Sequence, residues 1–340
     1  MSEIVQSDSS HRIHKVDAET IEAIGKCSHC FSEISANVAR VVLGQDDVVD
    51  HVLQCLIANG HVLLEGVPGL GKTLLVRALA TSIRVDTARI QFTPDLMPSD
   101  VTGHAQYSLK QEEFIIRKGP VFTNLLLADE INRAPAKTQS ALLEIMQERR
   151  ATIEGESFPV AKPYMVLATQ NPIEFEGTYP LPEAQLDRFM INAYIDYPAV
   201  DDEVAIVDQV TTGRAVDQLD TSAIEPVATV EDVSMAQEIA SKIHIDDEVL
   251  KYAVEIVRAT RNFNGVTQGA SPRAGIALAR MARAAALMSN RYFVIPDDIH
   301  STALPALRHR ISLSPEFQIE GLSPDKVLED IISEIPAPRT

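Results

Sequence analysis

The stretch HVLLEGVPGLGKT (61–73) joins an apolar run of strand length to a glycine-rich loop, and a helical pattern follows it. Strand, loop and helix in this order are the context that the phosphate-binding motif G-x-x-x-x-G-K-[ST] requires. The glycines let backbone N–H groups turn inward around phosphates, and the dipole of the following helix favours negative charge. A glycine-rich turn that only resembles the motif is the alternative, which the intact context disfavours. We predict a nucleotide site made by eight consecutive residues: Gly66, Val67, Pro68, Gly69, Leu70, Gly71, Lys72 and Thr73.

Four more short apolar runs follow along the chain, and helical segments separate them. Such runs, alternating with helices, indicate a parallel sheet that is buried on both faces. With residues 61–65 they predict a five-stranded parallel α/β sheet sandwiched by helices. Two further segments, 105–119 and 151–163, have strand-like halves around a polar turn and predict inserted β-hairpins. The four additional strand candidates are RIQFT (89–93), NLLLAD (124–129), YMVLAT (164–169) and INAYID (191–196).

The pattern changes at both ends of this region. Residues 1–35 are polar and then weakly helical, and we expect a loosely ordered lead-in. Residues 36–197 then form the α/β core. After Pro198 the strand signals largely stop, so residues 198–340 are predicted to form a small all-α lid domain. Its helices are expected at 231–243, 246–261, 271–290 and 296–310.

Composition narrows the classes of function. The 340 residues carry a formal charge of -18, which argues against nonspecific nucleic-acid binding, because that binding depends on basic side chains that neutralise phosphates. The sequence contains no apolar run of 18 residues and no secretion signal, so we expect a cytoplasmic protein without membrane insertion. Cys27 and Cys30 form a C-x-x-C that His51 and Cys55 could complete as a zinc site. Reduced thiols are the favoured interpretation, because a lone C-x-x-C is a weak signal.

Two acids end the apolar run LLLADE (125–130). A buried strand tolerates carboxylates only at its end, where they meet water or a cation. Asp129 fits a Mg²⁺ ligand beside Thr73, and Glu130 fits the base that orients an attacking water, while Lys72 holds the β/γ-phosphates of ATP. A plain acidic strand end is the alternative, and the intact phosphate loop disfavours it. The expected cofactors are therefore ATP and Mg²⁺.

Two more positions are candidates for contact with phosphate. Asn171 follows the apolar run 164–169, where it could touch the γ-phosphate or the water, although Asn-Pro can also be a simple turn. Ser271 and Pro272 have the character of an N-cap and first helical residue, which places Arg273 in the first turn. A cation there opposes the helix dipole by roughly 0.3–1 kcal/mol. A nucleotide phosphate would compensate for this cost, and a surface salt bridge is the equal alternative.

Together, GVPGLGKT (66–73), LLLADEINRAPAKTQSALLEIMQERR (125–150), ATQNPIEFEGTYPLPEAQLDRFM (168–190) and GASPRA (269–274) strongly resemble the MoxR family of AAA+ ATPases. The resemblance implies that Asn171 is the sensor 1 residue, Arg188 an arginine finger and Arg273 the sensor 2 residue. Both hairpins would face the central pore of a ring. A weaker correspondence places Gly44 and Gln45 in the adenine pocket.

The family also implies a homo-oligomer, in the form of a hexameric ring, and chaperone-like remodelling of partner proteins. Its partners often carry a von Willebrand factor A domain, which here would belong to a separate protein. A magnesium chelatase-like or helicase-like motor subunit is the nearest alternative. From another class, a nucleotide-sensing scaffold that binds without turnover is disfavoured by Asp129, Glu130, Asn171 and Arg188. Arg188 would have little to pair with inside its own subunit beyond Asp187, so we expect it to reach the γ-phosphate of a neighbour.

Overall fold

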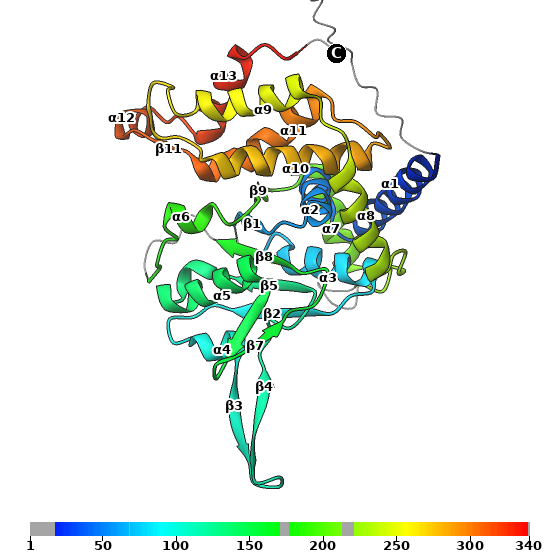
Figure 1. Cartoon of the computed structure of the whole chain (residues 1–340), viewed down its shortest axis with the longest axis vertical. Coiled ribbons are helices and arrows are strands. Elements are labelled where there is room, and N and C mark those ends of the chain that lie inside the picture. The colour runs from blue at the N-terminus through cyan, green and yellow to red at the C-terminus, as the bar shows by residue number, and fades with distance from the viewer. Residues whose placement is uncertain (1–17, 68, 171–176, 213–220, 339–340) are drawn as a thin grey trace, which may run out of the picture.

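The computed structural model describes residues 18–67, 69–170, 177–212 and 221–338. Its centre is a five-stranded sheet in the order β2-β5-β8-β1-β9, and all neighbouring strands run parallel. Helices cover both faces, a helical lid lies at one end, and a long hairpin projects at the other (Figure 1). The predicted fold class is confirmed. The strands are β1 (Val62–Glu65), β2 (Thr87–Gln91), β5 (Leu125–Asp129), β8 (Met165–Gln170) and β9 (Ile191–Tyr194).

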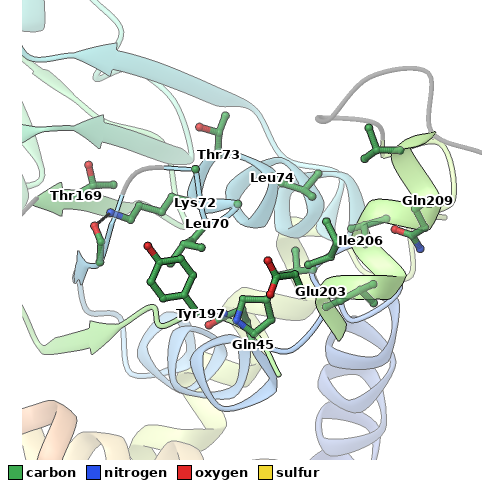
Figure 2. A pocket seen from close by; sticks show the side chains of 18 of the residues that line it. Gln45, Leu70, Lys72, Thr73, Leu74, Thr169, Tyr197, Glu203, Ile206 and Gln209 are labelled. Atoms are coloured by element: carbon green, nitrogen blue, oxygen red, sulfur yellow. Dashed lines mark hydrogen bonds between the residues drawn. The ribbon is translucent and has the colours of Figure 1, made fainter. Parts of the chain in front are cut away.

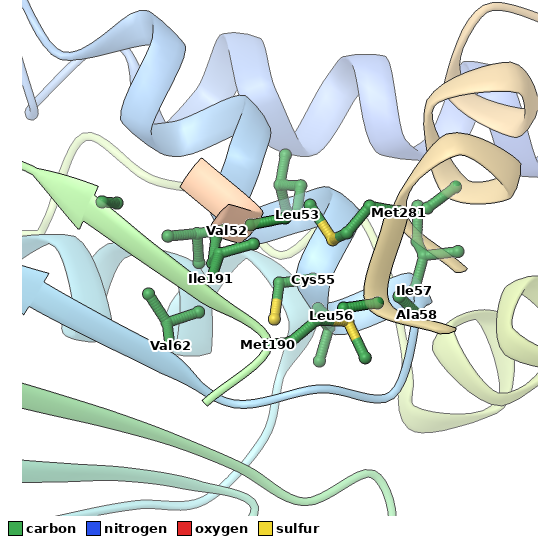
Figure 3. Close-up of a cluster of buried hydrophobic side chains, with 14 of the residues drawn as sticks. Val52, Leu53, Cys55, Leu56, Ile57, Ala58, Val62, Met190, Ile191 and Met281 are labelled. Atoms are coloured by element: carbon green, nitrogen blue, oxygen red, sulfur yellow. The ribbon is translucent and has the colours of Figure 1, made fainter. Parts of the chain in front are cut away.

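The apolar strands divide their side chains between two cores. Successive residues of a strand point to opposite faces, so Val62 and Leu64 of β1 join one buried cluster and Leu63 joins the other. The first cluster continues into the lid. In Figure 3, Cys55 and Leu56 of α2 (Asp46–Ile57) lie among strand residues and side chains of the lid. One continuous apolar core therefore joins the parallel sheet to the lid.

Four helices complete the α/β layer. The first two, α2 and α3, contribute buried side chains to the cluster that continues into the lid, and the last two contribute to the opposite cluster. Helix α3 is the next element after β1 in the chain, and the glycine-rich loop connects the two. They are α2, α3 (Lys72–Ile83), α4 (Pro98–Thr102) and α5 (Ala136–Glu148).

Both expected hairpins are present. The longer one consists of β3 (Gly103–Ser108) and β4 (Glu113–Lys118), and the shorter one of β6 (Arg150–Ile153) and β7 (Glu156–Pro159). Lys118 joins them, because its Nζ lies 4.9 Å from the ring centre of Phe122 and 5.7 Å from that of Phe158. Cation–π contacts of this kind hold the base of the long hairpin against the short one.

The second half of the expected lead-in is a packed helix. Helix α1 (Ala18–Val38) buries Cys27 and Phe31 in the larger core, and it contacts α3 as well as the lid helices α8 and α10. Ser28 Oγ donates to Met288 O at 2.8 Å, and Asn37 Nδ2 donates to Ser82 Oγ at 3.2 Å. Apolar positions repeat with helical spacing here, but the flanking polar residues hid that face in the sequence.

The lid is mainly helical, and four of its helices begin within about a residue of the predicted positions. Three further helices, α7, α12 and α13, were not predicted, and a two-stranded sheet, β10 (Val266–Gln268) with β11 (Ser312–Leu313), joins two loops. Among the described residues, no helix is long and apolar enough to cross a membrane. The lid helices are α7 (Val200–Thr211), α8 (Val230–Lys242), α9 (Asp247–Ala259), α10 (Pro272–Met288), α11 (Pro296–Leu307), α12 (Pro315–Ile319) and α13 (Pro324–Glu334), with a 3₁₀ turn η2 (Arg308–Arg310).

Candidate active site

The glycine-rich loop wraps the N-terminus of α3. Gly71 is the N-cap and has φ 77°, in the left-handed region that glycine tolerates best. Gly66 is required for a different reason, because a Cβ there would lie 2.3 Å from Ile195 O. Pro68 lies outside the described residues. The loop therefore leaves the first N–H groups of α3 free to face an anion.

Lys72 is held in the loop by a backbone contact. Its Nζ donates to Gly66 O at 2.6 Å. Burial lowers the pKa of Lys72, while the charges of Asp129, Glu130 and Glu65 act in the opposite direction. A half-buried ammonium group beside a carbonyl is a favourable site for phosphate oxygens, which would supply the missing counter-charge.

A cavity of about 910 Å³ extends from this loop toward the lid. Figure 2 shows Glu203, Ile206 and Gln209 of α7 on one side of it and Lys72 and Tyr197 on the other. The volume lies within the range of pockets that hold small-molecule ligands. Outside the phosphate loop, the cavity is lined by Arg40, Val41, Val42, Leu43, Gln45, Leu74, Arg89, Gln91, Asp129, Glu130, Thr169, Tyr197, Pro198, Glu203, Ile206, Val207, Gln209, Val210, Ser222 and Ala223.

The two residues expected at the adenine pocket behave differently. Gln45 lines the cavity, and its Nε2 donates to Asp196 O at 2.8 Å. Gly44 is not a lining residue, and it packs so closely that a Cβ would lie 2.8 Å from Asp202 Oδ2. The apolar residues of α7 were missed by sequence reasoning because they follow the last strand and belong to no motif.

Asp129 ends β5 with its carboxylate shared between two donors. Thr169 Oγ1 donates to Oδ1 at 2.6 Å, and the Arg89 guanidinium donates to Oδ2 at 2.6 Å. Thr73 also lines the cavity. One hydroxyl and one carboxylate suit Mg²⁺, which usually takes one or two protein oxygens together with substrate phosphates and water. The residues present therefore fit the ion, with Thr73 and Asp129 as its protein ligands.

Glu130 has a strained backbone. Its φ of 56° and ψ of 50° lie in the left-handed region, which is uncommon for residues other than glycine. Its N–H donates to Thr169 Oγ1 at 2.8 Å, and its carboxylate accepts from Gln91 Nε2 at 2.8 Å and from Arg133 at 3.0 Å. Such outliers concentrate at functional sites. Sequence reasoning found Asp129 and Glu130 but missed Thr169 on β8, Gln91 on β2 and Arg133 in the 3₁₀ turn that follows Glu130, which orient them.

Three predicted residues remain: Asn171, Arg188 and Arg273. Asn171 lies outside the described residues. Arg188 follows α6 (Glu183–Leu186), and its guanidinium donates to Leu143 O at 2.7 Å. Arg273 is in the first turn of α10, as the sequence predicted, and it is 60% exposed with NH1 3.9 Å from Asp187 Oδ2. Neither arginine lines the described part of the cavity.

Within its own subunit, the sequence offered Arg188 little to pair with beyond Asp187, and the Asp187 carboxylate faces the lid. Arg310 Nε donates to Asp187 Oδ1 at 2.7 Å, and Ser271 Oγ donates to Oδ2 at 3.0 Å. No described acidic side chain forms an ion pair with Arg188. Arg310 carried no signal in the sequence, since it lies 123 positions from its partner.

The cysteines give no support to a zinc site. In the part of the chain that the structure covers, no group of three or more His, Cys, Asp or Glu side chains could hold a metal ion. Burial raises the pKa of Cys30 to about 11 and also raises that of Cys27. These thiols therefore stay protonated near neutral pH.

Comparison with known proteins identifies the family. A model of the ATPase family associated with various cellular activities (AAA) matches residues 61–191, and an AAA lid domain model matches residues 258–331. Chaperone MoxR1 of Mycobacterium tuberculosis is 41% identical over 97% of this chain and 88% of its own length. Protein MoxR of Paracoccus denitrificans is 30% identical over 91% and 96% of the two chains. The crystal structure of a candidate ATPase from Cytophaga hutchinsonii superposes with a TM-score of 0.86 at 40% identity, and it covers 94% of this chain and 98% of its own. The chain therefore belongs to the MoxR family of AAA+ ATPases, enzymes that bind and hydrolyse ATP.

Proposed function

We propose that this protein forms a homo-oligomeric ring, a hexamer by family resemblance, whose Mg²⁺-dependent ATP hydrolysis drives the remodelling of partner proteins. One observation carries the ring. The ATP cavity has its own lysine and acids, whereas Arg188 and Arg273 lie outside it, next to Asp187. Cations that lie away from the ATP cavity of their own subunit suit a ring, because in a ring one subunit can complete the ATP site of the next.

Each residue of the cavity has a distinct role in this mechanism. Lys72 and the N–H groups of the phosphate loop bind the β- and γ-phosphates. Bound Mg²⁺, held by Thr73 and Asp129, would neutralise charge on those phosphates. Glu130, with Gln91 and Arg133 on its carboxylate, orients the attacking water and accepts its proton. Asn171 is proposed to contact that water or the γ-phosphate.

The two arginines act on the neighbouring subunit. Arg188 stabilises the negative charge that develops on the transferred phosphoryl group, and such fingers contribute roughly 10³–10⁵ in rate. Arg273 lies on the same side of the molecule, joined through Asp187, so we assign it to the same neighbouring nucleotide. The unfavourable position of Arg273 at a helix N-terminus supports this assignment, because a phosphate would compensate for it.

Mixed rings test the proposal. Arg188→Ala lacks the finger and Lys72→Ala lacks a competent site, so each alone should be nearly inactive. Mixed under subunit exchange, they should recover part of the ATP turnover, because some interfaces join an intact Lys72 site to an intact Arg188. Absence of recovery in rings shown to contain both variants would contradict the proposal. An Arg188→Ala protein with normal turnover would contradict it as well.

The long hairpin supports the partner-remodelling part. Its pairing places Tyr107 opposite Phe114, with ring centres 5.3 Å apart, while Leu109 is 87% exposed at the turn. An apolar ribbon projecting from the body is typical of a surface that contacts other proteins. MoxR1, a relative of this chain, is named a chaperone. The partner class implied by the family is a separate protein with a von Willebrand factor A domain.

A variant of the long hairpin separates the binding of partner proteins from ATP hydrolysis. Tyr107→Ser/Phe114→Ser should retain unstimulated ATP turnover but lose prevention of aggregation of a denatured model protein. Glu112→Gln, at the same tip, is the matched control. Retained chaperone activity in the double variant would remove the hairpin from the proposal. An ATP cavity is common to helicase-like and magnesium chelatase-like motors, so it does not distinguish these alternatives, whereas the net charge of -18 opposes the helicase-like one, which must bind nucleic acid.

A further inference from the structure

The backbone on both sides of Arg188 is held by one buried lid residue. Arg310, in η2, is 3% exposed at its side chain and forms an ion pair with Asp187. Its guanidinium also donates to Phe189 O at 2.8 Å and to Met190 O at 3.1 Å. The neighbouring His309 places Nε2 3.1 Å from Phe189 O. The lid thus contacts the chain immediately before and after the proposed finger.

The same carboxylate reaches a second part of the lid. Asp187 accepts from Ser271 Oγ, and Ser271 is the N-cap of α10, because the same Oγ accepts from Arg273 N at 3.2 Å. Residues from α6, η2 and α10 therefore meet at one carboxylate. A shift of the lid would move Asp187, and the segment that follows Asp187 carries Arg188.

We propose that the Asp187–Arg310 pair is a positioning device that sets Arg188 and couples it to the lid. This inference rests on the proposed action of Arg188 in a neighbouring subunit. A guanidinium donates several N–H groups at fixed angles, here to Asp187 Oδ1, Phe189 O and Met190 O, and so fixes direction as well as distance, which an ammonium group cannot do. A displacement of about 1 Å in a catalytic group can cost on the order of 10²-fold in rate.

A purely structural role is the competing explanation, because Asp187 also neutralises a buried cation. Removing one partner of a buried pair is strongly destabilising. The test therefore uses Arg310→Lys, which retains the positive charge but loses the planar set of N–H donors. The substitution is introduced into one of the two variant subunits of the mixed ring at a time. A structural defect would reduce ATP turnover whichever subunit carries the substitution, whereas a positioning defect would reduce it only when the subunit that donates Arg188 carries it.

The experiment starts from the Lys72→Ala and Arg188→Ala mixture. Arg310→Lys on the Lys72→Ala donor should lower the recovered ATP turnover roughly 10- to 100-fold. When the Arg188→Ala subunit, which supplies the intact Lys72 site, carries Arg310→Lys instead, the loss of turnover should be at least several-fold smaller, because this subunit already lacks Arg188. ATP binding by the Arg310→Lys protein alone, measured with a fluorescent ATP analogue, should stay within about twofold of wild type, because Arg310 does not line the cavity.

Asp298→Asn is the control, since Asp298 forms an ion pair with another arginine elsewhere in the lid, Arg291, at 2.6 and 2.7 Å. It should affect donor and acceptor equally. Equal losses from the two placements of Arg310→Lys, or no loss on the donor, would overturn the proposal. If the parent mixture itself recovers nothing, the action of Arg188 on a neighbour fails instead, so the two failures are distinguishable.

Discussion

The two charged regions of this subunit are built in opposite ways. At the ATP cavity, Asp129 pairs with Arg89, whose side chain is 52% exposed, and Glu130 shares its carboxylate between Gln91 and Arg133. Next to Arg188, Asp187 pairs with a buried Arg310 that has backbone acceptors for its other N–H groups. In Figure 1, α6, which precedes Arg188, and α7, which lines the cavity, lie on different sides of the sheet.

The contrast has an energetic basis. Exposed ion pairs are worth about 0–1 kcal/mol, so the partners of Asp129 and Glu130 can be exchanged for Mg²⁺ and water at little cost. A buried pair cannot be opened without leaving a desolvated charge. The cavity is therefore suited to the exchange of ligands, whereas the buried Asp187–Arg310 pair is suited to holding two segments in a fixed relative position.

The largest expected effect tests the chemical role of the cavity. Glu130→Gln should lower the turnover of ATP by roughly 10²–10⁴, because the water loses its base. The affinity for ATP should remain, since Lys72 and the loop N–H groups are intact. Steady-state turnover and nucleotide titration measure the two quantities. Glu255→Gln, on the exposed face of α9, is the control, and turnover at the wild-type rate in Glu130→Gln would remove Glu130 from this role.

The next effect compares the two ion pairs directly. Asp187→Ala should lower the free energy of unfolding by about 3–5 kcal/mol, because it leaves the Arg310 charge buried without its partner. Arg89→Ala should lower it by less than about 1 kcal/mol. Urea unfolding monitored by circular dichroism measures both. Similar losses for the two variants would abolish the distinction between an exchangeable and a fixed pair.

The smallest effect concerns pH. Burial lowers the pKa of His309, next to Arg310, well below its usual value, and that of His61, at the start of β1, to about 3. Below about pH 6.5 the unfolded chain binds protons that the folded chain excludes, so stability falls as pH falls, by up to about 1.4 kcal/mol per unit for each histidine.

Chemical unfolding at pH 7.5, 6.5 and 5.5 checks this expectation. His309→Gln retains a donor toward Phe189 O and should reduce the pH slope. His300→Gln, exposed on α11, is the matched control. A slope that His309→Gln leaves unchanged would mean that the lid junction does not sense protons in this range.

Much of the α/β core could be predicted because its signals are local. Apolar runs define strands, and residues 66–73 carry the strand, loop and helix context within one short segment. Asp129 and Glu130 were found for the same reason, since acids at the end of a buried strand are conspicuous. Helix α1 was underestimated, because its apolar face is stabilised by contact with α3, α8 and α10 rather than by its own sequence.

The sequence alone thus determined where the five core strands lie along the chain, the phosphate loop and the two acids. Only the tertiary structure decided which lid residues line the ATP cavity and that Asp187 turns to Arg310, 123 positions away, rather than to Arg188. The physical reason is the range of the forces involved. Backbone geometry and apolar periodicity act between near neighbours, whereas the pairing of a buried charge depends on which distant segment folding brings within hydrogen-bond distance.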